Sequence, residues 1–223
     1  MNHLLSHLMK KLHDPVYHSR LRELVKCILP HLKPGDRVLD VGCGNGALGG
    51  ALMAAFNKPT GLSVEGLERC ARGGEPIPVR AYDGGMIPAA DDSFDAVILA
   101  DVLHHEQDPD HLLRECARVS RRLLIIKDHQ IKGLLAHPRI KLLDWAANSP
   151  YGVPCLFRYN TPAEWARIPD RLNIDTILAI PSMRLYPFPY WIVFGGDLQY
   201  FTVLQKRPPH SGVSTARVAS GPT

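Results

Sequence analysis

The feature that most constrains this chain is a short apolar segment followed by three alternating glycines. Residues 37–41 predict a strand, Gly42, Gly44 and Gly46 follow it, and residues 47–56 predict a helix. Glycine permits positive φ angles and lets a ligand approach the backbone closely, while the first turn of a helix offers unpaired N–H groups. The order strand, glycine loop, helix therefore predicts an α/β protein with a small molecule bound across the loop.

The spacing of the glycines narrows the choice of ligand. A dinucleotide-binding loop follows the pattern G-x-G-x-x-G, whereas this loop reads D-x-G-x-G-x-G from Asp40 to Gly46. The pattern resembles the first motif of class I S-adenosylmethionine-dependent methyltransferases. The resemblance implies that Asp40 lies near the methionine end of the cofactor, and that Gly42, Cys43, Gly44 and Gly46 pass under its ribose and carboxylate. We therefore expect S-adenosylmethionine as the cofactor.

Two acidic residues compete for the ribose of that cofactor. Residues 62–68 predict a second strand, and Glu65 and Glu68 lie 19 and 22 residues after Gly46. In nucleotide-binding βαβ units, an acid about 20 residues past the loop accepts hydrogen bonds from the ribose. We favour Glu68 because it ends the predicted strand, just before a polar run. The alternative is that both glutamates are exposed surface residues.

A third acidic residue follows the short extended segment 77–82. It is Asp83, and Gly84 comes directly after it. The family resemblance implies that Asp83 meets the exocyclic amine of adenine and that Gly84 leaves space for the ring. A carboxylate that opens a glycine turn is also ordinary loop chemistry, so this alternative stays open.

The second strong motif surrounds residues 94–105. Residues 96–100 form an unbroken apolar run, which predicts a strand buried on both faces of a parallel sheet. Two sequence motifs flank this run: S-F-D-A-V at its start and D-V-L-H-H directly after it. Both resemble motifs of many small-molecule methyltransferases. The resemblance implies that Asp101 and Val102 contact the cofactor. A helix over 109–119 and a fifth strand over 123–127 are expected next.

Candidate catalytic residues follow the fourth and fifth strands. Ligands of open α/β sheets bind outside the carboxyl ends of the strands, so polar residues there point towards one crevice. His104 is our first candidate for a base or acceptor-orienting group, since an imidazole with an unperturbed pKa near 6.5 accepts a proton at cytoplasmic pH. His129 and Asp128 come next, and His105 is expected to be structural. The alternative is that both adjacent histidines only cap and pack the loop.

These segments predict a doubly wound α/β fold. We expect a mostly parallel seven-stranded sheet with helices on both faces. Residues 174–180 and 199–205 predict the final strands, and the family resemblance implies that the last one is antiparallel. Thr161 and Pro162 predict a helix start, with Thr161 as N-cap and Pro162 at the first helical position.

The domain organisation follows from the same pattern. Residues 1–34 predict two helices, interrupted at Asp14-Pro15, that cover the site. Residues 35–205 form the expected S-adenosylmethionine-binding methyltransferase domain, in which 130–170 is an insertion that caps the substrate. The tail 206–223 is rich in Pro, Ser, Gly and Thr and is expected to be disordered.

Composition and charge limit the partners. The 26 Lys+Arg and 22 Asp+Glu give a net charge of +4 without a basic block, so no nucleic-acid partner is expected. The N/D-P-P-Y/F tetrad of amino-directed base methylation is absent after the fourth strand. We therefore expect a small-molecule methyl acceptor, methylated at O, N, C or S. The rivals are a protein or RNA methyltransferase and a non-catalytic cofactor-binding or regulatory partner.

The cysteines and the apolar segments bear on location. Five cysteines without C-x-x-C spacing predict reduced thiols in the cytoplasm and suggest no metal site. The N-terminus lacks the apolar core of a signal peptide, and no window reaches the roughly 18 apolar residues of a spanning helix, so no stable membrane insertion is expected. The apolar segment 186–194 has four interpretations: a cover for the substrate site, a homodimer contact, a membrane contact, or a loop packed on the sheet edge.

Overall fold

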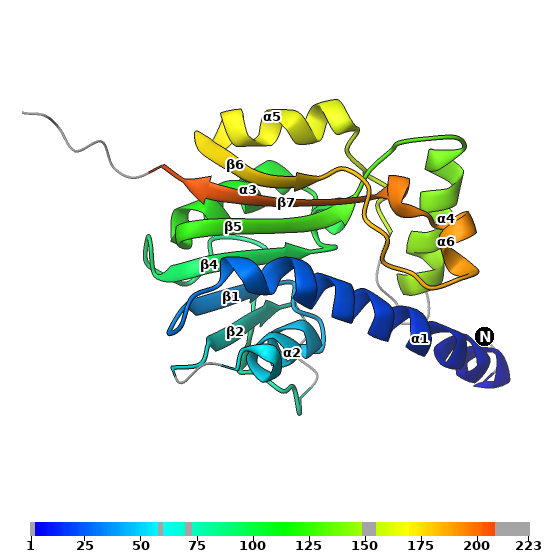
Figure 1. The fold of residues 1–223 in the computed structure, drawn as a ribbon, viewed down its shortest axis with the longest axis horizontal. Coiled ribbons are helices and arrows are strands. Elements are labelled where there is room, and N and C mark those ends of the chain that lie inside the picture. The colour runs from blue at the N-terminus through cyan, green and yellow to red at the C-terminus, as the bar shows by residue number, and fades with distance from the viewer. Residues whose placement is uncertain (1–2, 58–59, 70–72, 149–154, 208–223) are drawn as a thin grey trace, which may run out of the picture.

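The computed structural model describes residues 3–57, 60–69, 73–148 and 155–207, and its centre is a seven-stranded sheet (Figure 1). The strand order is β3-β2-β1-β4-β5-β7-β6. β7 pairs antiparallel with both β5 and β6, and the remaining pairs are parallel. The predicted fold class is confirmed. The strands are β1 (Arg37–Val41), β2 (Ser63–Glu68), β3 (Val79–Ala81), β4 (Phe94–Ala100), β5 (Ser120–His129), β6 (Ile174–Ile180) and β7 (Gln199–Lys206).

The strand order reverses between β1 and β4. From β1 the chain continues outward to β2 and β3, and it then returns to place β4 on the other side of β1. Such a reversal opens a crevice at the carboxyl ends of the two central strands, where open α/β sheets bind their ligands. The glycine loop directly follows β1, so it lies at this switch point.

Helices cover both faces of the sheet, and two more lie beside one end of it (Figure 1). α1 and α2 pack on one face, whereas α3 and α5 pack on the other. α4 and α6 stand together near the carboxyl ends of the central strands (Figure 1). The helices are α1 (His3–Ile28), α2 (Ala47–Ala55), α3 (Pro109–Val119), α4 (Ala136–Asn148), α5 (Pro162–Leu172) and α6 (Tyr190–Val193), with short 3-10 turns at Leu29–His31, Leu103–His105 and Gly196–Leu198.

The central strands are apolar on both faces because each face carries a helical layer. Side chains alternate between the two sides of a strand. Val97 and Leu99 of β4 therefore join the core under α3 and α5, while Ala96 and Ile98 join the core under α1 and α2. This arrangement explains the unbroken apolar run in the sequence.

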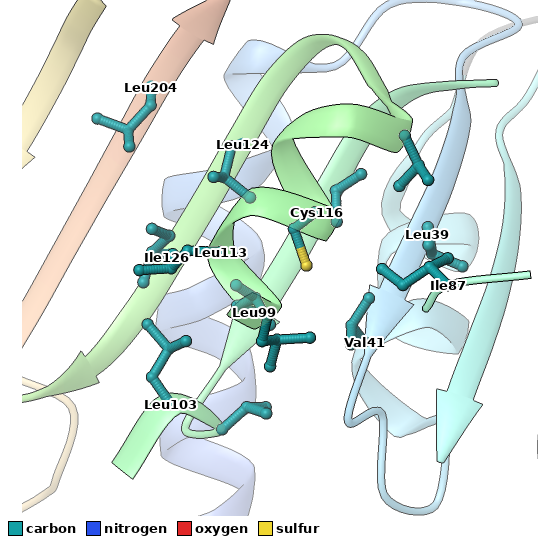
Figure 2. Close-up of a cluster of buried hydrophobic side chains, with 14 of the residues drawn as sticks. Leu39, Val41, Ile87, Leu99, Leu103, Leu113, Cys116, Leu124, Ile126 and Leu204 are labelled. Carbon is teal, nitrogen blue, oxygen red and sulfur yellow. The ribbon is translucent and has the colours of Figure 1, made fainter. Parts of the chain in front are cut away.

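α3 illustrates how the helical layer is held. Leu113 and Cys116 point from α3 towards the side chains of β1, β4 and β5 in Figure 2. Leu112 and Val119 are also buried, which gives the helix one apolar face at helical spacing. Burying a leucine side chain contributes about 1.5–3 kcal/mol, so this face fixes α3 on the sheet.

One expected interruption is wrong. The N-terminal segment forms a single helix, α1, which passes through Asp14 and Pro15. A proline inside a helix removes one backbone N–H donor, and that is a local loss. The many intrahelical hydrogen bonds on either side maintain the helix, since helix propagation is cooperative.

Three further expectations changed or fell outside the described residues. β5 extends beyond the expected 123–127 because it pairs with β7 as far as His129. The segment 186–194 contains α6. Tyr186, which precedes this helix, is buried, whereas Ile192 within the helix is 58% exposed. Most of the tail expected to be disordered, 208–223, lies outside the described residues.

Among the helices that the structure describes, none combines the length and the apolar character that crossing a bilayer requires.

Candidate cofactor and acceptor site

The glycine loop after β1 has the backbone that its sequence requires. Gly42, Gly44 and Gly46 have φ angles of +69°, +59° and +71°, in the left-handed region that glycine adopts without a steric penalty. A Cβ at Gly42 would lie 2.5 Å from Cγ2 of Val102, whereas one at Gly44 would meet no described atom within 4 Å. Packing therefore requires glycine at position 42, while position 44 borders open space.

Asp40 lies next to this loop and is buried. It is 2% exposed, and its Oδ2 atom has no hydrogen-bond partner among the described residues. Burial raises the pKa of Asp40 to about 7; the nearby Arg20 opposes this rise and Glu68 adds to it. Because buried polar atoms normally have partners, this carboxylate oxygen is suited to a donor or cationic group of a ligand.

The two competing glutamates lie in different environments. Glu68 ends β2, and its carboxylate accepts hydrogen bonds from the backbone N–H of Gly44 at 2.7 Å and of Arg69 at 2.9 Å. Glu65 instead forms ion pairs with Arg37 and Arg80, both at 3.2 Å. Glu68 therefore contacts the glycine loop and Glu65 does not. The assignment of the ribose to Glu68 stays a prediction.

Asp83 and Gly84 follow β3 in a tight turn. The carboxylate of Asp83 accepts a hydrogen bond from the N–H of Gly85 at 2.9 Å. This is the usual bond of a carboxylate that opens a glycine turn. A Cβ at Gly84 would lie 2.8 Å from Nη2 of Arg69. Arg69 is held there by an ion pair with Glu106 at 2.7 Å. The adenine contact of Asp83 stays a prediction.

Asp101, directly after β4, joins three elements. It has a φ angle of +63°, and its carboxylate pairs with Arg20 of α1 at 2.6 Å and with the buried Lys127 of β5. Burial alone would raise the pKa of Asp101, but Lys127 and then Arg20 outweigh this effect and hold the pKa well below its ordinary value. No local sequence pattern points to Arg20, which lies 81 residues away in the chain.

His104 is buried, which differs from our expectation. It is 4% exposed, and its Nδ1 atom lies 2.5 Å from Oδ1 of Asp128. Burial favours the neutral ring, but the carboxylates of Asp128 and Asp144 outweigh it and raise the pKa of His104 to about 10. The expected unperturbed pKa is therefore wrong, because an imidazole that is already protonated is a poor general base near neutral pH.

His129, the second candidate, is neutral. Burial, followed by the positive charge of Lys127, lowers the pKa of His129 to about 3. Its Nδ1 atom has no hydrogen-bond partner among the described residues. The ring centroids of His104 and His129 are 4.8 Å apart. The two imidazoles thus lie side by side, although neither has the pKa of a base that works near neutrality.

The insertion after β5 adds residues that the sequence analysis missed. Asp144 of α4 lies 3.7 Å from Nε2 of His104 and 3.8 Å from Nε2 of His105, and its other oxygen accepts a 2.6 Å hydrogen bond from the hydroxyl of Tyr159. We expected His105 to be structural, yet it faces the same carboxylate as His104. The loose pattern of residues 130–170 gave no signal for either Asp144 or Tyr159.

The sheet order, the glycine loop at its switch point and the acids after β1 and β2 define a class of protein. They are the features of the class I S-adenosylmethionine-dependent methyltransferases, and the chain is similar to this family over the residues given next. Within this class, a family model described as methionine biosynthesis protein MetW matches residues 22–129. That range contains the glycine loop and ends with β5.

Known relatives agree with this class, and a solved structure shares the fold. The chain is 36% identical over 116 residues to a 27-O-demethylrifamycin SV methyltransferase of Amycolatopsis mediterranei, covering 46% of this chain and 41% of the relative. It is 34% identical over 114 residues to a demethylmenaquinone methyltransferase of Corynebacterium efficiens, covering 48% and 45%. The matches thus span less than half the length of these relatives. A SAM-dependent methyltransferase structure from Aquifex aeolicus has a TM-score of 0.59 and 20% identity, covering 91% of this chain and 98% of that chain.

Proposed function

We propose that this protein binds S-adenosylmethionine at the glycine loop and transfers its methyl group to a small-molecule acceptor. The observation that carries the proposal is the buried, partly unpartnered carboxylate of Asp40 beside a glycine loop that borders open space at Gly44. A ligand with a cationic group and a sugar satisfies both features. The family resemblance supplies the identity of that ligand.

The residues of the chain fit the parts of this cofactor. We assign the methionine ammonium group to Asp40, the ribose hydroxyls to Glu68 and the adenine amine to Asp83. Val102 packs against Gly42 and shapes the end of the loop, while the Arg20 and Lys127 ion pairs fix Asp101 beside it. When bound, the cofactor supplies a methyl group on a sulfonium, which is a strong electrophile.

The protein's own contribution is alignment. Methyl transfer is an in-line displacement, so holding the acceptor atom in line supplies much of the rate enhancement and no covalent nucleophile is required. We assign His104, held by Asp128, and the neighbouring His129 to orienting the acceptor, because their pKa values do not suit a general base. A small-molecule acceptor is favoured because the two relatives described above are named for small molecules.

Two sets of contacts support a covering role for the first 34 residues. Tyr17 of α1 donates a hydrogen bond to the side chain of Asn45 in the glycine loop at 3.0 Å, and Arg20 pairs with Asp101. α1 therefore touches both the loop after β1 and the end of β4. We infer that it closes one side of the cofactor site, and that the insertion 130–170, through Asp144, closes the acceptor side. A cytoplasmic location remains our prediction.

The test is direct binding. Isothermal titration calorimetry of the purified chain should show binding of S-adenosylmethionine and S-adenosylhomocysteine, and none of NAD. Binding of NAD without either sulfur nucleoside would refute the cofactor assignment. A screen of small molecules with radiolabelled cofactor then tests transfer. Transfer to a protein or an RNA, with none to small molecules, would refute the acceptor class, and binding with no transfer to any of them would favour a non-catalytic role.

A further inference from the structure

Three potential metal ligands meet beside the end of β4. Within the part of the chain that the structure describes, one side-chain atom each of His104, His105 and Asp144 lies within 4.8 Å of the other two. The carboxylate of Asp144 is 3.7 Å from Nε2 of His104 and 3.8 Å from Nε2 of His105. Two imidazole nitrogens with one carboxylate oxygen are a ligand set that suits Zn²⁺.

The surroundings of these residues orient them as the outer contacts of a metal site do. Asp128 holds Nδ1 of His104 at 2.5 Å, which directs Nε2 towards Asp144, and the backbone N–H groups of Leu103 and His129 hold Asp128 in turn. Tyr159 donates a hydrogen bond to Oδ2 of Asp144, and the side-chain amide of Asn148 donates one to Oδ1 at 2.7 Å, so both carboxylate oxygens are held in place. A carboxylate on the far nitrogen of a ligating histidine fixes the ring orientation and tautomer and raises its basicity as a ligand.

The distances are close to those of an assembled site. With metal–ligand bonds of about 2.0–2.1 Å, tetrahedral geometry separates two ligand atoms by about 3.3 Å. The separations of 3.7 and 3.8 Å from Asp144 need to shorten by only a few tenths of an ångström, while the two histidine nitrogens, within 4.8 Å of each other, must move closer by a rotation of the more exposed His105 ring. His104 and Asp144 are almost fully buried, whereas the side chain of His105 is 18% exposed, so an ion has access on the His105 side.

We propose that His104, His105 and Asp144 form a binding site for a divalent transition-metal ion, with Zn²⁺ as the favoured ion. Three protein ligands leave a fourth coordination position, which in zinc proteins holds water or a substrate atom. The site lies after the carboxyl end of β4, on the side that we assign to the acceptor, so this position suits an oxygen or sulfur atom of the acceptor. The metal site itself does not depend on the proposed methyl transfer.

The competing explanation is purely electrostatic. In that case a proton on His104, shared between Asp128 and Asp144, is the only cation of the cluster, and His105 contributes nothing essential. The two explanations differ in the role of His105. A metal site loses one of three ligands when His105 is replaced, whereas the protonated cluster keeps all of its members.

The experiment measures metal binding to the protein without any cofactor. Chelator-treated full-length chain is titrated with Zn²⁺ by calorimetry, and with Co²⁺ for the visible absorption of the bound ion. We expect one tight site in the wild type, and a loss of affinity of about tenfold or more in His105→Gln. His111→Gln, on α3 and outside the cluster, is the matched control and should bind like the wild type. Asp128→Asn should weaken binding by about 10–100-fold.

Two outcomes of the titration contradict a metal site. Equal Zn²⁺ affinity in the wild type and in His105→Gln, or no tight site in the wild type, would overturn the proposal. Thermal melting of the metal-free variants shows whether each is folded, and His105→Gln is the change least able to disturb the fold because this side chain is the most exposed of the three. Binding of S-adenosylmethionine, measured on the same samples, reports on the proposed function separately.

Discussion

Replacing Asp40 by asparagine should make the cofactor-free protein more stable relative to the wild type as the pH rises, and it should weaken cofactor binding. Asp40 is buried, its Oδ2 atom has no partner among the described residues, and burial raises its pKa from 3.8 to about 7. Between these two pH values the folded chain keeps a proton that the unfolded chain has lost. The free energy of unfolding of the wild type therefore falls as the pH rises towards about 7 and then levels off.

The size of this effect follows from the two pKa values. At about pH 5.5 the Asp40 carboxyl is protonated in the folded protein and ionised in the unfolded chain. Its raised pKa then lowers the free energy of unfolding by the equivalent of about 1.7 pKa units. At about pH 8 the carboxyl is ionised in both states, and the free energy of unfolding is lowered by the equivalent of about 3.2 pKa units. The difference of about 1.5 units equals about 2 kcal/mol. Arg20, which faces Asp40 from α1, keeps its charge over this range.

Urea denaturation at the two pH values measures this difference. Asparagine does not titrate, so the stability of Asp40→Asn minus that of the wild type should rise by about 2 kcal/mol between about pH 5.5 and about pH 8. Other titrating groups, such as the histidines, are common to both proteins and cancel. Calorimetry at about pH 8 should show at least a tenfold weaker binding of S-adenosylmethionine to the variant.

Two results would refute this reasoning. A stability difference that is the same at both pH values would show that Asp40 has an ordinary pKa in the folded protein. Cofactor binding by Asp40→Asn as tight as that of the wild type would show that the carboxylate has no part in the site. The two results are independent, because the first is measured without cofactor.

Glu68→Gln should weaken S-adenosylmethionine binding by about tenfold to a hundredfold, because a carboxylate accepts charge-assisted hydrogen bonds from ribose hydroxyls. Glu65→Gln is the matched control, and calorimetry showing a larger loss for Glu65 would contradict our choice. Gly42→Ala should lower the melting temperature, because its Cβ would lie 2.5 Å from a side-chain carbon. Gly44→Ala borders open space but has a φ of +59°, which costs alanine about 1–2 kcal/mol of stability; its Cβ should also weaken cofactor binding, and unchanged cofactor affinity would argue against a ligand at this loop.

Several elements could be predicted from the sequence because their signals are local. The strand 37–41 has the expected bounds, and the helix after it begins at the expected residue. The helix start at Thr161 and Pro162 is confirmed, and Glu164 completes a capping box there. Glycines with positive φ, an N-cap and an apolar run are properties of neighbouring residues, so the sequence determines them directly.

The family resemblance and the fold class also follow from the sequence. The glycine loop and the D-V-L-H-H segment both lie where a strand meets a loop, and the glycine loop is legible in the sequence because the positive φ angles of its backbone favour glycine. The order of the strands places these loops at one edge of the sheet. The sequence therefore determined which loops meet at this edge, and the cofactor residues on them stay predictions.

Only the tertiary structure brought together the residues that we assign to the acceptor side. Asp144 comes from α4 and meets two histidines that lie about forty residues earlier in the chain, and Arg20 reaches Asp101 from α1. The pKa values of His104 and His129 move in opposite directions because one lies beside carboxylates and the other beside a lysine. Burial and charge depend on residues brought together by folding, so no local pattern in the sequence records them.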